Sequence, residues 1–151
     1  MTPLGPLTPP ARPAADSEGD LSRRALLRLD AAASNLSLTQ QGPAGITGAS
    51  NYWLDVADPA TGAPAARLWF LDSMSRGCRS THYTNGCVGD DTVAWLARVG
   101  GGLPKVPAQI AFAHVPLPEV IAAWDDSESH GGRGEEVCCP LRNTGLLATA
   151  K

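Results

Sequence analysis

The run from Ala66 to Ser73, ARLWFLDS, constrains the fold more than any other segment of the chain. Its centre is almost continuously apolar, which is typical of a strand buried on both faces. A strand is also predicted over Asn51–Val56, and the turn-rich ADPATGAPA between the two indicates a hairpin with a long connection. Gln109 to Val115, QIAFAHV, predicts a third strand. We therefore expect a layered fold in which the strand at 66–73 is covered on both sides.

Helical patterns alternate with these strands. Apolar residues recur at helical spacing from Asp20 to Leu36, where Asp20 or Ser22 can act as the N-cap. A short helix is predicted from Asp90 to Val99, with the two aspartates at its start as caps and the three glycines after it as its stop. Val120 to Trp124 predicts one helical turn, and a further helix begins in 143–151. The alternation indicates an α/β domain, although three strands are few for a complete sheet.

The chain has room for one modest domain. Of its 151 residues, 16 are Gly, 13 are Pro and 43% are hydrophobic, but many of the hydrophobic residues are Ala. Residues 1–15, MTPLGPLTPPARPAA, have no periodicity and are predicted to form a disordered Pro-rich tail. Order is expected over 16–151.

Charge and hydropathy argue against two kinds of partner. The net charge is −3, and Arg23 and Arg24 form the largest basic cluster, so no nucleic-acid partner is expected. The longest apolar stretches, such as Gln109–Leu117, are far shorter than the ~20 residues of a membrane helix, so no membrane span is expected. The N-terminal segment lacks the apolar core of a signal peptide. Localisation stays open between cytoplasmic and secretory.

The four cysteines permit two interpretations. Cys78 and Cys87 can form a disulfide if the protein is secreted, whereas the adjacent Cys138 and Cys139 are poorly suited to pairing with each other. Alternatively, Cys78, His82 and Cys87 could bind Zn, but their spacing matches no standard finger and a second ligand pair is missing.

Among the three histidines, His114 has the most informative position. It ends the third predicted strand, just before Pro116, which forbids the strand to continue. Strand-end positions followed by a loop often hold reactive side chains in α/β folds, although a hydrogen-bonded histidine at the edge of a core is the simpler interpretation. Asp72 ends the second strand, where it can cap the following turn or ligate a metal. His82 and His130 lie in polar loops and are expected to be solvated.

Several strings occur in an order that resembles one known family. They are Asn51–Val56 (NYWLDV), Leu68–Ser73 (LWFLDS), Trp95-Leu96, Ala111–Glu119 (AFAHVPLPE), the Gly134-Glu135-Glu136 region and Asn143-Thr144-Gly145. In this order the chain resembles the calcineurin-like metallophosphoesterases, in particular the purple-acid-phosphatase-like branch of plants, algae and fungi. The resemblance runs from about Asp16 to Lys151.

The resemblance implies a double β-sandwich flanked by helices and a dinuclear centre of Fe, Mn or Zn. Two such metals polarise a phosphate ester and activate a hydroxide for in-line attack. His114 corresponds to the histidine of the family's H-PLPE string, a metal ligand, so the resemblance favours the ligand role for His114.

The chain also departs from the family. In the family's GNHD motif the Asp corresponds to Asp16, but the preceding residues are Pro13, Ala14 and Ala15, so the Asn and His of the motif are absent. The earlier D-x-H and GD motifs and the later GHxH motif are missing as well. Of the expected ligands only His114 remains, and no catalytic residue is identified. One imidazole cannot hold a dinuclear site.

These departures predict that 16–151 is the central portion of a phosphoesterase domain truncated at both ends, with incomplete sandwich layers. The isolated chain is then expected to bind no metal and to be inactive toward a phosphate-ester substrate. The alternative is a catalytically dead interaction module derived from the same fold. In either case, missing strands should leave sheet edges and apolar faces uncovered.

Overall fold

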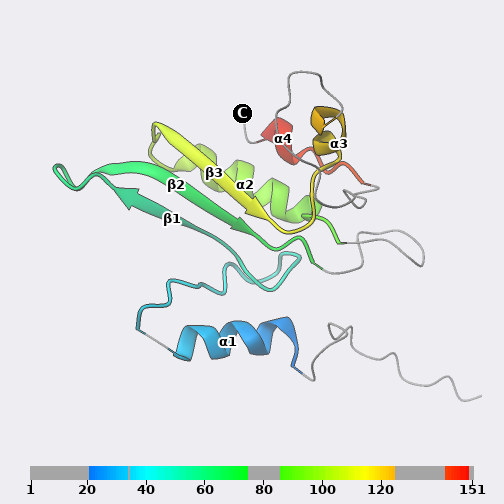
Figure 1. Ribbon diagram of the computed structural model, residues 1–151, viewed down its shortest axis with the longest axis horizontal. Helices are drawn as coiled ribbons and strands as arrows, with labels where there is room; N and C mark the ends of the chain where they lie inside the picture. The colour runs from blue at the N-terminus through cyan, green and yellow to red at the C-terminus, as the bar shows by residue number, and fades with distance from the viewer. Residues whose placement is uncertain (1–20, 34, 75–85, 125–141, 150–151) are drawn as a thin grey trace, which may run out of the picture.

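The computed structural model describes residues 21–33, 35–74, 86–124 and 142–149 (Figure 1). The described part is a mixed α/β structure, as the sequence predicts, with a three-stranded sheet in the order β1-β2-β3. The predicted tail at 1–15 lies outside the described residues. Four helices accompany the sheet; the elements are α1 (Arg23–Ala33), β1 (Asn51–Ala57), β2 (Pro64–Leu71), α2 (Asp90–Gly102), β3 (Ala108–Ala113), α3 (Pro118–Trp124) and α4 (Leu146–Thr149).

The predicted hairpin is confirmed. β1 and β2 are antiparallel, with Trp53 opposite Trp69, and the connection is tightened where the Asp58 carboxylate accepts hydrogen bonds from the amides of Ala60 and Thr61. β3 lies on the other side of β2 and runs parallel to it. A parallel connection requires a crossover, and α2 provides it.

One face of the sheet packs against α2 and forms the core. Trp53, Trp69 and Trp95 meet there, with ring centroids 5.7 to 6.1 Å apart. The Trp69 indole also donates a 2.9 Å hydrogen bond to Gln109, which links β2 to β3. Farther along β2, the Arg67 guanidinium is only 2% exposed and pairs with Asp55 at 2.7 and 3.1 Å. The apolar core members are Trp69, Leu71, Val88, Val93, Trp95, Leu96 and Leu146.

The opposite face of the sheet, here called the open face, consists of Tyr52, Leu54, Val56, Leu68, Phe70, Ile110 and Phe112. Three of its rings form a ladder across the strands: Tyr52 stacks on Phe70 at 4.9 Å and Phe70 on Phe112 at 5.3 Å. In Figure 1, α2 crosses behind the sheet and no described helix covers the face toward the viewer. Val56, Ile110 and Phe112 are accordingly 46 to 51% exposed. On β2 itself, Leu68 and Phe70 of this face are only partly buried, whereas Arg67, Trp69 and Leu71 of the other face are buried. The predicted full burial of the second strand on both faces is therefore wrong for the described residues.

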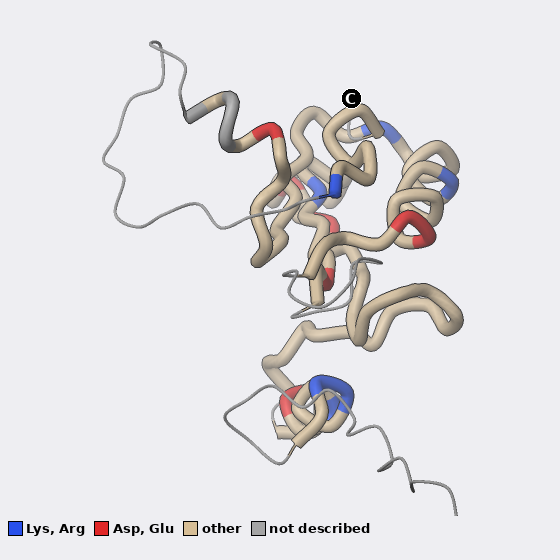
Figure 2. The backbone as a smooth tube through the Cα atoms, turned by 90° about the vertical axis from the view of Figure 1, so that its right-hand side faces the viewer, with Lys and Arg blue, Asp and Glu red and all other residues tan. Residues whose placement is uncertain are grey.

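The first helix is shorter than predicted. α1 spans Arg23–Ala33 instead of Asp20–Leu36, and Ser22 acts at its start because its hydroxyl accepts a 3.2 Å hydrogen bond from the Ala25 amide. None of its residues is buried. The apolar periodicity correctly indicates a helix, but in the described structure α1 lies apart from the sheet (Figures 1 and 2). Polar contacts link it to the segments beside the sheet: Arg23 bonds Asp72 just after β2, and Arg24 bonds the Gly48 carbonyl in the loop before β1.

The second helix begins at Asp90, as predicted, but it is capped differently and ends at Gly102 instead of Val99. Its N-cap is Gly89, which has no side chain to cap with, while Asp90 and Asp91 lie inside the first turn. There, a carboxylate still interacts favourably with the helix dipole. The helix continues through the three glycines to Gly102 because its buried Val93 and Leu96 anchor the preceding turns. Figure 2 shows both signs of charge on α1 and α2, in line with the mixed charges of the sequence.

The last two helices are short. α3 spans Pro118–Trp124, two residues longer at its start than predicted, and α4 covers Leu146–Thr149 within the predicted 143–151. Leu146 is buried against the core beside α2. No helix among the described residues is both long and apolar enough to cross a membrane.

Candidate functional site

The carboxyl ends of β2 and β3 meet at one edge of the sheet. Leu71 and Ala113 are the last residues paired between the two parallel strands, so Asp72 and His114 follow at equivalent positions. Both line an open hollow of about 500 Å³, together with Ser50, Tyr52 and Phe112. The prediction that His114 lies at the carboxyl end of a strand is confirmed, and Asp72 lines the same hollow. We call Asp72, Ser73, His114 and Val115 the carboxyl edge.

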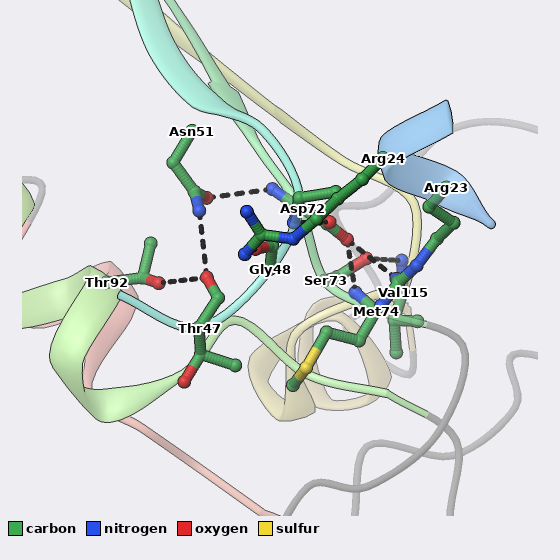
Figure 3. Close-up of polar contacts among 11 residues, drawn as sticks. Arg23, Arg24, Thr47, Gly48, Asn51, Asp72, Ser73, Met74, Thr92 and Val115 are labelled. Carbon is green, nitrogen blue, oxygen red and sulfur yellow. Dashed lines mark hydrogen bonds and ion pairs between the residues drawn. The ribbon is translucent and has the colours of Figure 1, made fainter. Parts of the chain in front are cut away.

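Ser73 and Val115 join the two strands beyond their last ladder pair. The Val115 amide donates a 2.9 Å hydrogen bond to the Ser73 hydroxyl, and both residues are buried (Figure 3). A buried amide without an acceptor costs about 1 to 3 kcal/mol, so separating Val115 from Ser73 would be unfavourable. The serine therefore holds the chain segments after β2 and β3 together and fixes the direction in which each leaves the sheet.

The Asp72 carboxylate already has three hydrogen-bond donors (Figure 3). One oxygen accepts from the Met74 amide at 2.7 Å and from the Arg23 guanidinium of α1 at 3.0 Å. The other accepts from the Ala49 amide at 2.5 Å. Of the two roles considered for Asp72, the structure shows turn capping. This carboxylate also anchors α1 and the loop before β1.

The capped turn has an unusual backbone. Met74 has φ of 57°, a left-handed conformation that is costly for a residue with a side chain. The bond from its amide to Asp72 helps to hold this conformation. Close packing continues on both sides: a Cβ on Gly48 would lie 2.9 Å from the Asp72 Cβ, and a Cβ on Gly86 would lie 2.0 Å from the Ser73 carbonyl oxygen. Both positions therefore require glycine.

Asn51 links the carboxyl edge to the loop before β1. Its side chain is 2% exposed; its oxygen accepts a 3.0 Å hydrogen bond from the Asp72 amide, and its Nδ2 donates to the Thr47 carbonyl at 2.9 Å. The hydroxyl of Thr92, fully buried in α2, donates to the same carbonyl at 3.1 Å. One carbonyl thus connects the loop, β1 and α2.

Asp91 reinforces this connection from the first turn of α2. Its carboxylate accepts hydrogen bonds of 2.7 Å from both the amide and the hydroxyl of Thr47, and a 2.8 Å bond from the Thr92 amide. Burial raises the pKa of Asp91, but the hydrogen bonds from Thr47 and Thr92 outweigh it and hold this pKa below its ordinary value.

His114 differs from its neighbours in having no such network. Its side chain is exposed, and its imidazole makes no hydrogen bond within the part of the chain that the structure describes. The simpler interpretation, a hydrogen-bonded histidine at the edge of a core, is therefore not what the described structure shows. The ring is available to a ligand that enters the hollow.

The described residues do not fit a dinuclear metal centre. They contain no group of three or more His, Cys, Asp or Glu side chains that could hold a metal ion. Asp72, the carboxylate that lines the hollow with His114, has its oxygens engaged by Arg23 and two backbone amides. His82 and His130 lie outside the described ranges.

Cys87 forms a disulfide, so it has no thiolate to offer a metal. This removes it from the Zn interpretation. Cys78, its proposed disulfide partner, lies outside the described residues, as do Cys138 and Cys139. Cys87 itself is buried, next to the core residue Val88.

Most of the polar network is not predicted by the sequence patterns. Asn51, Ser73 and Thr92 were assigned only to a strand or a helix, yet each is buried and bonds a backbone group of a distant segment. One signal was present in the sequence: Asn51 and Ser73 are polar residues at the ends of apolar strands, where an unpaired side chain would be costly to bury.

Comparison with known proteins gives no match: no protein-family model, curated protein or solved structure is significantly similar to this chain.

Proposed function

We propose that this chain contains part of a metal-dependent phosphoesterase domain, with His114 as its one remaining metal ligand. The proposal is supported by the order of the strings from NYWLDV to NTG, which resembles the calcineurin-like metallophosphoesterases. The observation that carries the proposal is the position of His114. It lies at the carboxyl end of β3, where it lines the same hollow as Asp72. Its side chain is exposed and has no hydrogen-bond partner among the described residues. Strand-end anchoring is what a metal-ligating imidazole needs. The double β-sandwich of that family belongs to the proposal as well.

In the complete domain, two bound metals would polarise the phosphate ester and supply a hydroxide. The described residues contribute one imidazole to such a centre, and Asp72 is committed to Arg23 and the backbone. We therefore propose that this polypeptide alone does not hydrolyse phosphate esters. The phosphate-ester substrate and the dinuclear centre belong to the complete domain.

Two measurements test the proposal. The first is the sequence of the adjoining reading frame, where upstream D-x-H, GD and GNH strings and a downstream GHxH string are expected. Their absence in a frame bounded by authentic stops would contradict the proposal that the chain is a piece of an active phosphoesterase. The second is the turnover of p-nitrophenyl phosphate by the purified chain, with metal content measured on the same sample. Stoichiometric metal with metal-dependent turnover would overturn the proposed inactivity.

A second candidate function is a catalytically inactive interaction module. The open face favours it, because Val56, Ile110 and Phe112 are each about half exposed on a sheet surface that no described helix covers. Exposed apolar patches of this kind often mark protein-protein contacts. Authentic stops and a mapped transcript start, together with absent turnover, would favour this module over a piece of an enzyme.

A further inference from the structure

β3 is an exposed edge strand. It pairs with β2 on one side only, no other described strand pairs with it, and all six of its residues are exposed. A strand at the edge of a sheet presents a row of unpaired amide and carbonyl groups that can pair with another strand. Proteins usually protect such edges with a charge, a proline, a bulge or a covering element.

β3 carries neither a charge nor a proline nor a bulge, the three devices of this kind that lie within a strand itself. Its residues, AQIAFA, include no charged residue and no proline, and no irregularity interrupts its register with β2. In Figure 1, β3 forms the upper border of the sheet. α2 lies behind the sheet, α3 and α4 lie beyond the carboxyl end of β3, and α1 lies below the sheet on the side of β1.

The opposite edge of the sheet is protected. β1 carries Asp55, paired with Arg67, and its register is shifted by an irregularity between Val56 and Ala57. A charge and a bulge are two of the devices that prevent a further strand from adding. The two edges therefore differ, and an association through β3 would end after one partner instead of extending into a fibre.

From this contrast we propose that two copies of the chain pair through antiparallel β3 strands. A second copy fits this edge for two reasons. Two-fold antiparallel pairing places each β3 against an identical strand, so the strand must be compatible with itself. β3 meets this condition because it carries no charge that would repel its own copy. Antiparallel pairing of the two β3 strands gives hydrogen-bond partners to the amide and carbonyl groups that point away from β2. The alternative contact, stacking of two open faces, would leave these groups unpaired.

The register follows from the exposed side chains. A two-fold axis at Ala111 sets Ile110 opposite the partner's Phe112, and Phe112 opposite the partner's Ile110. These two side chains are 51 and 49% exposed in the single chain and lie on the same face of the sheet. Directly opposed apolar side chains contact each other across an antiparallel pair. The result is a six-stranded sheet with both copies of α2 on one side.

The test measures the mass of the full chain by sedimentation equilibrium over a wide concentration range. Pairing through one strand makes a small interface, so a reversible dimer with a dissociation constant of roughly micromolar or weaker is expected. Ile110→Lys places a charge in the pair and should raise this constant by about tenfold or more. Val56→Lys is the matched control: it adds the same charge to an equally exposed position of the open face, but on β1, and should leave the dimer intact.

Other results would overturn the proposal. A wild-type chain that stays monomeric would do so, as would open-ended polymers or an Ile110→Lys variant that still dimerises. If Ile110→Lys and Val56→Lys are both monomeric and folded, the two copies associate by stacking their open faces, and the proposed pairing of β3 strands is wrong. If Ile110→Lys fails to fold by circular dichroism, hydrogen exchange of the wild type decides. Protection of 108–113 that rises with concentration, with 51–57 unchanged, supports the pair, and unchanged protection of 108–113 contradicts it.

Discussion

The hydroxyl of Ser73 accepts a 2.9 Å hydrogen bond from the amide of Val115, and so joins the segments that follow two parallel strands. The two residues are 42 positions apart in the chain. Since Asp72 and His114 immediately precede them, this bond sets the relative position of the two side chains that line the hollow. This side chain–backbone hydrogen bond, together with the β2–β3 ladder, thus fixes the geometry of the candidate site.

Replacing Ser73 with Ala should destabilise the protein, because the buried Val115 amide would lose its acceptor. We expect a decrease of about 1 to 2 kcal/mol in the free energy of unfolding, measured by urea denaturation. Ser50→Ala is the control, since the Ser50 hydroxyl donates a 2.7 Å bond to the Gln40 carbonyl in an exposed loop. Its loss should cost about 0.5 kcal/mol or less. Equal losses for the two variants would contradict the structural role of Ser73.

Gly48 should tolerate no side chain. Its φ is +101°, and a Cβ would lie 2.9 Å from the Asp72 Cβ and 3.0 Å from the Asn51 amide nitrogen. Gly48→Ala therefore combines backbone strain with a clash against Asp72 and the buried Asn51, and should cost about 3 kcal/mol or more.

Gly45→Ala separates these two effects. Gly45 also has a positive φ, +84°, but a Cβ there would meet nothing within 4 Å. Backbone strain alone should cost about 1 to 2 kcal/mol. Thermal or urea melts of the two variants give the comparison, and a Gly45→Ala variant as unstable as Gly48→Ala would show that the clash contributes little.

The strands were predictable because their signal is local. Apolar stretches bounded by turn residues predicted all three strands to within two residues at each end, and the strand-end position of His114 followed directly. The prediction that β2 is buried on both faces was wrong. An apolar stretch shows that a strand can be buried, but it does not show which elements cover each face. α1 shows the same limit, since its apolar stripe predicts a helix but none of its residues is buried.

The network around the carboxyl edge could not be predicted in this way. Asn51, Asp72 and Thr92 are brought together by the pairing of β1 with β2 and by the packing of α2, over separations of more than 20 residues. Sequence periodicity contains no information about such partners. Only the capping role of Asp72, which depends on the turn directly after it, was within reach.

Asn51 and Thr92 should act together on the carbonyl of Thr47. Asn51→Ala leaves the Asp72 amide without its acceptor and should cost about 2 to 3 kcal/mol, whereas Thr92→Val leaves the Thr47 carbonyl bonded to Asn51 and should cost about 1 kcal/mol. The double variant removes both donors and should lose about 0.5 kcal/mol or more beyond the sum of the single losses. Strict additivity in a double-mutant cycle would show that the shared carbonyl does not couple them.

The network should also make stability depend on pH in the acid range. The pKa of Asp91 is below its ordinary value in the folded protein, because the hydrogen bonds from Thr47 and Thr92 outweigh the effect of burial. The unfolded chain therefore takes up this proton first as the pH falls. The stabilisation by Asp91 is complete above the unfolded pKa of about 3.9 and is lost as the pH falls through the folded pKa.

Asp91→Asn tests this dependence, since it removes the titrating group at the same size. The variant should be less stable than the wild type at pH 7, and the difference should shrink below about pH 4. Asp58→Asn is the comparison: the pKa of Asp58 is also lowered, first by the Thr61 amide, but its bonds lie within an exposed turn at the opposite end of β1 from Thr47. Asp91→Asn should therefore increase hydrogen exchange in the loop containing Thr47, and Asp58→Asn should leave that loop unchanged. A stability difference for Asp91→Asn that stays constant from pH 7 to pH 3 would contradict the assignment.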